Sequence, residues 1–332
     1  MWVEDRVGRY PRYHPPTERE TTLIEVTSRV SQGRSLLRPS TKVNRRIIGV
    51  IGRAQRLYEV KIHGVGFLST HDHQLCSFKS VEQQALFMQH IQTNLSKEVG
   101  RLHDWSGPMW SRRYRGIPIA EEEEVQYERL RYLLSQGCKE GLVENPLEWP
   151  GVNSAWHLWH GITEMEGEWV DRTALYNARR KKGGALLTEA DFTKVETIEL
   201  SPMPLWEHLS PEEYQARVRN MIEGIAEEAR ERNRARGKRA MGVAVVLARH
   251  PHSRPAHLDT SPAPHVHCSS KEKRSQFWEA FREFMSSYRA AAERMRHGEL
   301  TAKFPPGCFT PRRQFVPRQR EPEPRARAPG TA

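Results

Sequence analysis

The chain has 332 residues, 37% hydrophobic and 28% charged, which is enough for one large packed domain or two ordinary ones. Its 52 Lys and Arg against 41 Asp and Glu give a formal net charge of +11, which favours a polyanionic partner such as nucleic acid. The four cysteines form no Cys-x-x-Cys pair, which argues against a zinc ribbon or a disulfide framework, and the lack of a signal peptide or long apolar run predicts a cytoplasmic protein without a membrane span.

The first half of the chain predicts alternating strands and helices after a polar lead-in at residues 1–20. Residues rich in β-branched side chains, with apolar and polar positions partly alternating, indicate strands at 22–30, 58–67, 71–78 and 110–119. The second and third of these are separated by only a short connection, so we expect them to pair as an antiparallel hairpin.

Helices are expected at 45–55, from Ser80 to about residue 102, and at 121–138. Ser80 and Gln83 form a capping-box pattern that is followed by a regular amphipathic period. The third helix begins with acidic residues, and Gly137 marks its expected end. The order strand, helix, hairpin, helix, strand, helix predicts an α+β fold, in which helices pack on an antiparallel sheet.

The second half gives a weaker pattern. Ser210 and Glu213 predict a capped helix that runs to about residue 233, and a further helix with an aromatic face is expected after Ser269. Signals between these helices and in the region after Pro150 are mixed. We therefore predict four parts: an extended lead-in at 1–20, a sheet domain at 21–155, a mainly helical extension at 156–310, and a basic disordered tail at 311–332.

Candidate metal ligands occur in three His-x-His triplets: His71-Asp-His73, His250-Pro-His252 and His265-Val-His267. On a strand, side chains two residues apart project from the same face, so both imidazoles can reach one ion. Only the first triplet lies in a predicted strand; the other two lie beside prolines, where a surface loop is the simpler interpretation. For any single His-x-His triplet, the simplest interpretation is still two solvated side chains. A second sequence feature is therefore needed before a metal site is predicted.

The helix at 121–138 supplies that feature. Leu130 and Leu134 are four residues apart and predict its buried stripe, from which Tyr132 is rotated by about 200° around the helix axis. Tyr132 and Gln136 then share a polar face, on which a hydroxyl and an amide oxygen can approach one point. Taken alone, Tyr132 would be read as an amphipathic aromatic residue at a boundary between helix and sheet.

Together with the first histidine pair, residues 131–150 resemble the single-tyrosine HUH transposases, and specifically the REP-associated tyrosine transposases. The matching features are Tyr132, the Gly-Leu-Val sequence that begins at Gly141, and a later Pro and aromatic-Pro pair, all in the family's order and spacing. The resemblance covers roughly residues 20–155. Because it rests on several motifs in the right order, it is more specific than any one of them.

Two positions depart from the family pattern. Asp72 stands between the histidines, where the family has a hydrophobic residue, and Gln136-Gly137 stands where the family has Asn-Pro. Asp72 is expected on the opposite face of the strand from the histidines, and a charge there must be wet or paired. Gln136 still supplies an amide oxygen.

The resemblance implies a ferredoxin-like HUH nuclease fold and a DNA transposase that cleaves and rejoins single-stranded or hairpin DNA at palindromic repeats. It implies that His71, His73 and Gln136 bind a divalent ion, Mg²⁺ or Mn²⁺, and that Tyr132 is the nucleophile that forms a 5′-phosphotyrosine link. The resemblance allows a homodimer. It leaves open whether Tyr132 acts within its own subunit or at the site of its partner. The part beyond residue 155 resembles the extension of some bacterial transposases and is expected to help grip a hairpin or flanking duplex.

Arg112, Arg113, Tyr114 and Arg115 are the predicted DNA-binding residues, because cations interleaved with aromatic rings suit a single strand. A solvated strand face explains the same residues equally well. Two other functions are open: a catalytically silent, domesticated DNA- or RNA-binding protein with the same fold, and a related HUH nuclease of replication initiation or plasmid relaxation. The sequence has no Walker motif, which disfavours the last of these.

Overall fold

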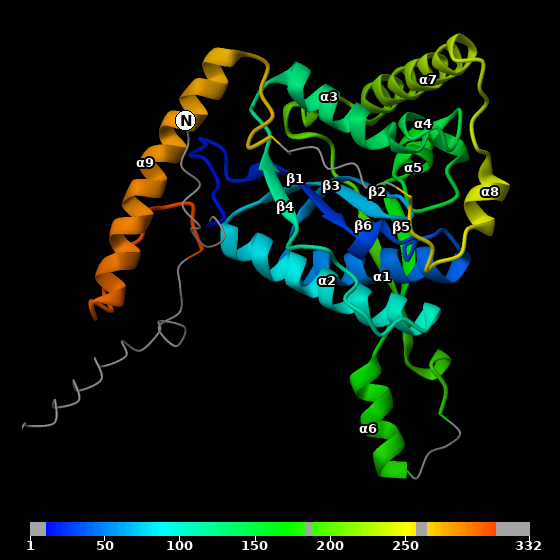
Figure 1. Ribbon diagram of the computed structural model, residues 1–332, viewed down its shortest axis with the longest axis horizontal. Helices are drawn as coiled ribbons and strands as arrows, with labels where there is room; N and C mark the ends of the chain where they lie inside the picture. Colours follow the sequence, from blue (N-terminus) through cyan, green and yellow to red (C-terminus); the bar gives the residue numbers. More distant parts are fainter. Residues whose placement is uncertain (1–10, 183–186, 257–263, 310–332) are drawn as a thin grey trace, which may run out of the picture.

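A computed structural model describes residues 11–182, 187–256 and 264–309 of the chain (Figure 1). The first half follows the predicted order: β1 (Thr22–Arg29), α1 (Thr41–Tyr58), β2 (Lys61–Phe67), β3 (His71–Phe78), α2 (Val81–His103), β4 (Arg115–Pro118), α3 (Glu123–Leu134) and α4 (Gln136–Lys139). The second half contains α5 (Ala155–His160), β5 (Glu164–Val170), α6 (Arg172–Lys182), β6 (Thr193–Glu199), α7 (Pro211–Ala235), α8 (Val243–Ala248) and α9 (Lys271–Arg296). No helix in the described part of the chain is both long enough and apolar enough to cross a membrane.

The main sheet has four antiparallel strands in the order β2-β3-β1-β4, which confirms the predicted α+β class. Directly opposite residues in such a sheet point to the same face. His73 of β3 lies opposite Thr27 of β1 and Gly66 of β2, so all three face the same side. Helices α1 and α2 cover one face of the sheet, whereas α3, α4, α5 and α7 lie on the other (Figure 1).

The caps predicted from sequence form largely as expected. The Ser80 hydroxyl accepts a hydrogen bond from the Gln83 backbone N–H and begins α2, although the Gln83 side chain accepts from the Lys79 N–H and does not complete the capping box. Ser210 and Glu213 form the complete reciprocal box at the start of α7. The aromatic helix α9 is capped by Ser270, one residue later than predicted.

The strand predicted at 110–119 forms only in its second half. Arg115–Pro118 pairs along β1 and the Ile119 N–H donates to the Leu23 carbonyl at 3.0 Å, while Trp110 makes one isolated bridge with Val30. The Trp110 indole N–H donates to the backbone carbonyl of Gln92, 3.0 Å away, and residues 111–113 form a bend. The strand-favouring residues at the start of this segment are therefore explained by side-chain packing. The contact of Trp110 with Gln92 outweighs the local propensity of the segment to form a strand.

The helix predicted at 121–138 is divided at Ser135, and Gly137 does not terminate it. Gly137 lies inside α4, where an added Cβ would come within 3.0 Å of Val143 Cγ2 and 3.3 Å of the Trp149 ring. Glycine is required there for close packing. The residue in the left-handed conformation is Gly141, with a φ of 68°.

Sequence reasoning missed the β5–β6 hairpin, which packs backbone to backbone against α1. A Cβ added to Gly49 of α1 would lie 2.2 Å from the carbonyl carbon of Glu168, and one added to Gly167 would lie 2.3 Å from the Gly49 nitrogen. Glu196 of β6 binds both Arg53 and Arg56 of α1, at 3.0 and 2.7 Å. Gly49 of α1 and Gly167 of β5 therefore permit the close approach of the two backbones, and the ion pairs of Glu196 stabilise the packing of the hairpin on the helix.

The part of the chain beyond residue 155 shares the hydrophobic core of the sheet domain. Buried residues on both sides of that position belong to one cluster, including Ile62 on β2 and Ile198, Trp206 and Val218 after it. The backbone after β6 also reaches the sheet directly, because the Ser201 N–H donates to the Ile62 carbonyl at 2.7 Å. The boundary at residue 155 stays a prediction, and no break in the core marks it.

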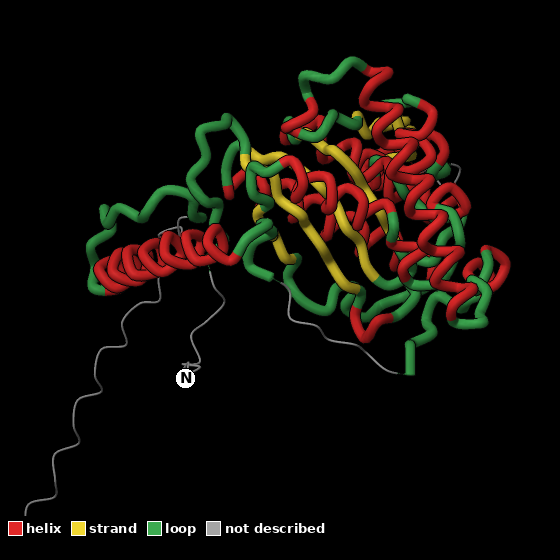
Figure 2. Tube along the Cα trace, turned by 90° about the horizontal axis from the view of Figure 1, so that it is seen from above, coloured by secondary structure: helices red, strands yellow, loops and turns green. Residues whose placement is uncertain are grey.

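Helix α9 lies apart from the sheet and the other helices, as both views show (Figure 2). Its apolar face forms a second cluster of buried residues, made of Phe281, Phe284, Met285 and Cys308. Tyr13, from the lead-in, packs onto this cluster and its ring centroid lies 4.4 Å from that of Phe284. The predicted tail at 311–332 lies outside the described residues, as do residues 1–10.

His63 of β2 makes the stability of the fold sensitive to acid. The side chain is fully buried, with Nδ1 2.7 Å from the Pro202 carbonyl oxygen and Nε2 2.8 Å from the Ser77 hydroxyl. Burial lowers the pKa of His63 from 6.5 to about 4. The unfolded chain therefore binds a proton at a higher pH than the native chain does, and stability is lost as the pH falls from about 6.5 towards about 4.

We expect His63→Gln to weaken this pH dependence. The contribution of one such group approaches about 1.4 kcal/mol per pH unit within the window. Urea unfolding at about pH 7 and about pH 4.5 should show that the variant loses less free energy of unfolding on acidification than the wild type does. An equal loss in both proteins would mean that other groups carry the acid sensitivity.

Candidate functional site

His71 and His73 project from the same face of β3, towards α3. Their ring centroids are 5.3 Å apart. Nδ1 of His71 is hydrogen-bonded to the Thr70 hydroxyl at 2.9 Å, and Nδ1 of His73 to a carboxylate oxygen of Glu25 at 2.8 Å. In His73, Nε2 is consequently the nitrogen left to meet a ligand, whereas the His71 ring is also hydrogen-bonded to the Gln136 side chain. Burial, with the nearby His73 and Arg29, lowers the pKa of His71 to about 3, so this imidazole is neutral at physiological pH.

Tyr132 and Gln136 reach the histidines from the end of α3 and the start of α4. The Tyr132 ring centroid lies 5.5 Å from that of His73. Gln136 is 1% exposed, its amide N–H donates to the Tyr132 carbonyl oxygen at 3.0 Å, and its side chain is also hydrogen-bonded to His71. The four residues predicted as nucleophile and metal ligands are thus brought together across β3, α3 and α4.

Two cations lie against the Tyr132 ring. The Arg129 guanidinium carbon is 4.6 Å from the ring centroid, and the Lys139 ammonium nitrogen is 4.1 Å from it. Both are attracted to the electron-rich face of the ring. Since each keeps hydrogen-bond donors that the ring does not use, they also give the half-buried Tyr132 a surrounding suited to an anionic ligand.

Sequence reasoning missed a buried carboxylate at this site. Glu25, near the centre of β1, is 3% exposed and contacts His73 through one oxygen. Its other oxygen lies 2.7 Å from Nε2 of His267 and 3.6 Å from the guanidinium of Arg129. Burial by itself would raise the pKa of Glu25, but the contacts with His267 and His73 outweigh it and hold the pKa well below the usual value. An acidic residue at the centre of an otherwise apolar and β-branched strand was the available signal.

The interpretation of the third histidine triplet as a surface loop is wrong for His267. Its backbone extends the edge of the sheet beyond β4: the His267 N–H donates to the Pro118 carbonyl, and the Ala120 N–H donates to the His267 carbonyl, both at 2.9 Å. The side chain is 13% exposed and faces Glu25. His265 instead stacks near Trp278 of α9, with ring centroids 4.6 Å apart. The two histidines therefore do not act as a pair.

The predicted donor set at β3 consists of side chains of types that divalent ions accept. No group of three or more His, Cys, Asp or Glu side chains within residues 11–182, 187–256 and 264–309 is arranged to hold a metal. The predicted set depends instead on two imidazoles and one amide, with the third donor from Gln136. Two imidazoles on one strand face, beside a buried amide, provide ligands of the kind that several divalent ions accept.

Asp72 is paired and buried. It lies on the α2 side of the sheet, is 1% exposed, and accepts a hydrogen bond from the Gln74 amide at 2.9 Å. Burial raises the pKa of Asp72 to about 7, against the opposing effect of hydrogen bonds from Gln74 and Ser28. The departure from the family pattern therefore lies behind the sheet, away from Tyr132.

The predicted DNA-binding residues divide into two kinds. Arg112, Arg113 and Arg115 are exposed, whereas Tyr114 is 6% exposed and has the Arg12 guanidinium 4.9 Å from its ring centroid. Burial raises the pKa of Tyr114 to about 12. A cavity of about 450 Å³ brings together three of the four predicted residues with residues of the lead-in and of α9, and its lining includes Arg113, Tyr114, Arg115, Arg12, Phe277 and Phe281.

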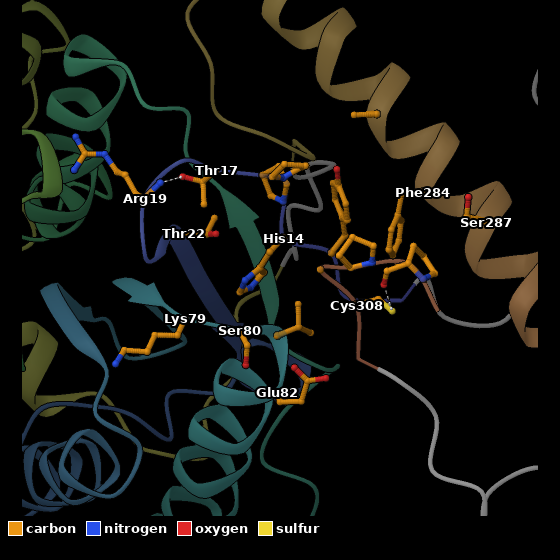
Figure 3. A pocket seen from close by; sticks show the side chains of 18 of the residues that line it. His14, Thr17, Arg19, Thr22, Lys79, Ser80, Glu82, Phe284, Ser287 and Cys308 are labelled. Carbon is orange, nitrogen blue, oxygen red and sulfur yellow. Dashed lines mark hydrogen bonds between the residues drawn. The ribbon is translucent and has the colours of Figure 1, made fainter. Parts of the chain in front are cut away.

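A further cavity, of about 600 Å³, lies between α9 and the start of α2 (Figure 3). Its charged side chains have mixed sign, with Arg19 and Lys79 against Glu82, and His14 is tied to Gln84 at 2.9 Å. Lys79 follows the last residue of β3, whereas His71 is the first, so roughly 24 Å of strand separates this cavity from the histidines. It is not part of the site at Tyr132.

No protein-family model matches the sequence, and no curated protein matches it. Among the solved structures to which the chain is similar are two described as transposases. One, described as the REP-associated tyrosine transposase bound to a REP hairpin, has 16% identity and a TM-score of 0.37, with 45% of this chain and 82% of that chain covered. The other, assigned as a transposase of Deinococcus radiodurans R1, has 9% identity and a TM-score of 0.27, with 35% of this chain and 92% of that chain covered.

Proposed function

We propose that this protein is a metal-dependent tyrosine transposase, which cleaves and rejoins single-stranded or hairpin DNA in the cytoplasm through a 5′-phosphotyrosine intermediate. The observation that carries the proposal is the meeting of His71, His73 and Gln136 with Tyr132 at one point on the sheet. The net charge of +11 supports a nucleic-acid substrate.

His71, His73 and Gln136 would hold a divalent ion, Mg²⁺ or Mn²⁺, through two imidazole nitrogens and an amide oxygen. Bound there, such an ion would polarise a non-bridging oxygen of the scissile phosphate and offset the charge that develops on it. Glu25 fixes the tautomer of His73 by accepting its Nδ1–H, and Thr70 holds Nδ1 of His71. Both contacts orient the imidazole rings so that Nε2 faces the proposed metal site. Groups that hydrogen-bond metal-binding histidines commonly orient them in this way.

Tyr132 is the nucleophile in this proposal. Its Oη attacks the scissile phosphorus, so that an Oη–P bond forms as the P–O3′ bond breaks; the phenolic proton passes to solvent and the departing 3′ oxygen becomes a hydroxyl. Arg129 and Lys139 flank the ring with positive charge where the phosphate must lie. Attack by another 3′-OH reverses the step, and because one phosphodiester is exchanged for another, no external energy source is needed.

The single-stranded part of the substrate would follow the cavity at β4. Arg113 and Arg115 line it together with the half-buried Phe277 of α9. Proteins usually bind single-stranded nucleic acid with cations that neutralise the phosphates and with aromatic rings on which the bases stack. Tyr114 would contribute little stacking because it is buried beneath Arg12.

The metal requirement gives the direct test of the proposed function. Purified protein, Mn²⁺ and a labelled hairpin with a single-stranded flank should yield a covalent protein–DNA adduct that a chelator prevents. His71→Ala removes one of three expected ligands, and we expect it to lower the rate of adduct formation by at least about 100-fold. Gel separation of the denatured adduct measures this rate.

His252→Ala is the matched control, because it changes a histidine of another His-x-His triplet. His252 contacts the His103 carbonyl at 2.8 Å and the Trp105 ring, far along the chain from Tyr132. It should leave the rate close to that of the wild type. If no adduct forms in the wild type while the hairpin still binds, the protein is a catalytically silent DNA-binding protein and the proposal fails.

A further inference from the structure

The C-terminal end of α7 carries a concentration of positive charge with no ion-pair partner. Arg230, Arg234, Arg236, Lys238 and Arg239 are all exposed. Within the described ranges, none of the five forms an ion pair with a carboxylate. Residues 230–239 contain six Arg and Lys in all and one acidic residue, Glu231. Unpaired cations at this density repel one another, so their arrangement is most stable when an anion lies among them.

The backbone folds these cations around a hollow of about 640 Å³, which we call the α7 basic cup; its lining includes Arg230, Arg234, Lys238 and Arg239. Gly237 has a φ of 58° and ends the helix, and the Lys238 N–H returns to donate to the Asn233 carbonyl at 3.0 Å. This reversal brings Lys238 and Arg239 back beside Arg234. The only acidic side chain in the lining, Glu144, accepts a hydrogen bond from the Asn233 amide at 3.0 Å.

The lining of the α7 basic cup indicates which form of nucleic acid it suits. Surfaces that hold single strands combine cations with aromatic rings on which bases stack, and the cavity at Arg113 has both. The α7 basic cup contains no aromatic side chain. Arg and Lys without stacking groups contact phosphates alone, as expected for a double helix whose bases are already stacked inside.

The position of the α7 basic cup relates it to Tyr132. Arg232, one turn of α7 before the helix end, donates to the Cys138 carbonyl of α4 at 2.6 Å. The next residue of α4, Lys139, lies against the Tyr132 ring. Figure 1 shows the end of α7 beside α4, on the same side of the sheet as α3. One short helix thus separates the cup from the tyrosine.

We propose that the α7 basic cup binds the phosphate backbone of a double-stranded DNA stem while the adjoining single strand lies at Tyr132. The inference rests on the proposed function for the identity of the substrate as DNA with a hairpin. It assigns to the part of the chain beyond residue 155 a direct role in substrate binding, with Arg230, Arg234, Lys238 and Arg239 as the phosphate ligands.

Equilibrium binding tests the assignment without requiring any chemistry. The variant R230Q/R234Q/K238Q/R239Q would be compared with the wild type on two labelled DNAs without metal: a hairpin with a single-stranded flank, and an unpaired strand of equal length. Each phosphate contact to a duplex adds about 0.9 to the slope of log K against log salt concentration. We expect the variant to lose about 3.6 from this slope on the hairpin, with affinity at least roughly tenfold lower near physiological salt, and to bind the unpaired strand as the wild type does.

A variant with equal charge loss on α6 and β6, R179Q/R180Q/K181Q/K194Q, is the matched control, because these four side chains are also exposed and α6 projects away from the face of the sheet that carries α3, α4 and α7 (Figure 1). It should keep the hairpin slope of the wild type. The inference is overturned if the control variant loses as much slope as the α7 variant, or if the α7 variant loses none, or loses as much on the unpaired strand. Failure of the wild type to form an adduct would count against the proposed function only, since the binding slopes are measured without catalysis.

Discussion

Tyr132→Phe is expected to abolish covalent attachment of the protein to DNA, lowering the rate of adduct formation by at least about 10³-fold. The substitution removes only the attacking oxygen. The ring keeps its contact with His73 and its place between Arg129 and Lys139, so the affinity for hairpin DNA should change little. Adduct formation with Mn²⁺ and a binding isotherm on the same preparation measure the two quantities separately.

Tyr127→Phe provides the comparison on the same helix. Tyr127 is half-buried, and its ring lies against Trp206, with centroids 6.1 Å apart, away from the histidine pair. We expect the wild-type rate of adduct formation from this variant. An adduct formed equally well by Tyr132→Phe would show that another group is the nucleophile, and the assignment of Tyr132 would be abandoned.

Gly49→Ala should destabilise the protein by roughly 3 kcal/mol or more, although alanine is the better helix former by about 1 kcal/mol. The reason is the approach of β5 to α1. The new Cβ would lie 2.2 Å from both the carbonyl carbon and the oxygen of Glu168, and these are backbone atoms that cannot rotate away. The hairpin must therefore shift from the helix and weaken the ion pairs that Glu168 makes with Arg45 and Arg46.

Gly224→Ala in α7 is the control, because a Cβ there meets nothing within 4 Å. This variant should gain up to about 1 kcal/mol, since it retains the advantage of alanine in a helix without the clash. Urea unfolding of both variants gives the two changes in free energy. If Gly49→Ala were as stable as the wild type, the β5–β6 hairpin would not pack on α1 as described, and the single core across residue 155 would be in question.

The local part of the site was predictable from sequence because its geometry depends on short-range periodicity. Side chains two apart on a strand share a face, which placed His71 with His73. Side chains four apart on a helix do the same, and Gln136 indeed bonds back to the Tyr132 carbonyl, even though the helix is interrupted at Ser135. The caps at Ser80 and Ser210 are local for the same reason.

The prediction of a strand over 110–119 was wrong for its first half, because the amino-acid composition of a segment does not show whether the segment has a strand to pair with. Only the second half of that segment pairs with β1, and the bend at 111–113 turns Tyr114 into the core beneath Arg12. The β5–β6 hairpin was missed for the related reason that its pattern is weak. Its buried positions include Gly167 and Glu196, which approach or pair with α1, so the buried face of the hairpin is not marked by large apolar residues.

The sequence by itself determined the class of fold, the pairing of the histidines, and the helix face that carries Tyr132, since each follows from repeats a few residues long. Only the tertiary structure decided that Glu25 lies between His73 and His267, and that the end of α7 adjoins α4. Glu25 and His267 are separated by more than 200 residues of chain, and no local periodicity links them. Their contact exists because the backbone at His267 pairs beyond the end of β4 and a buried carboxylate requires partners for both of its oxygens.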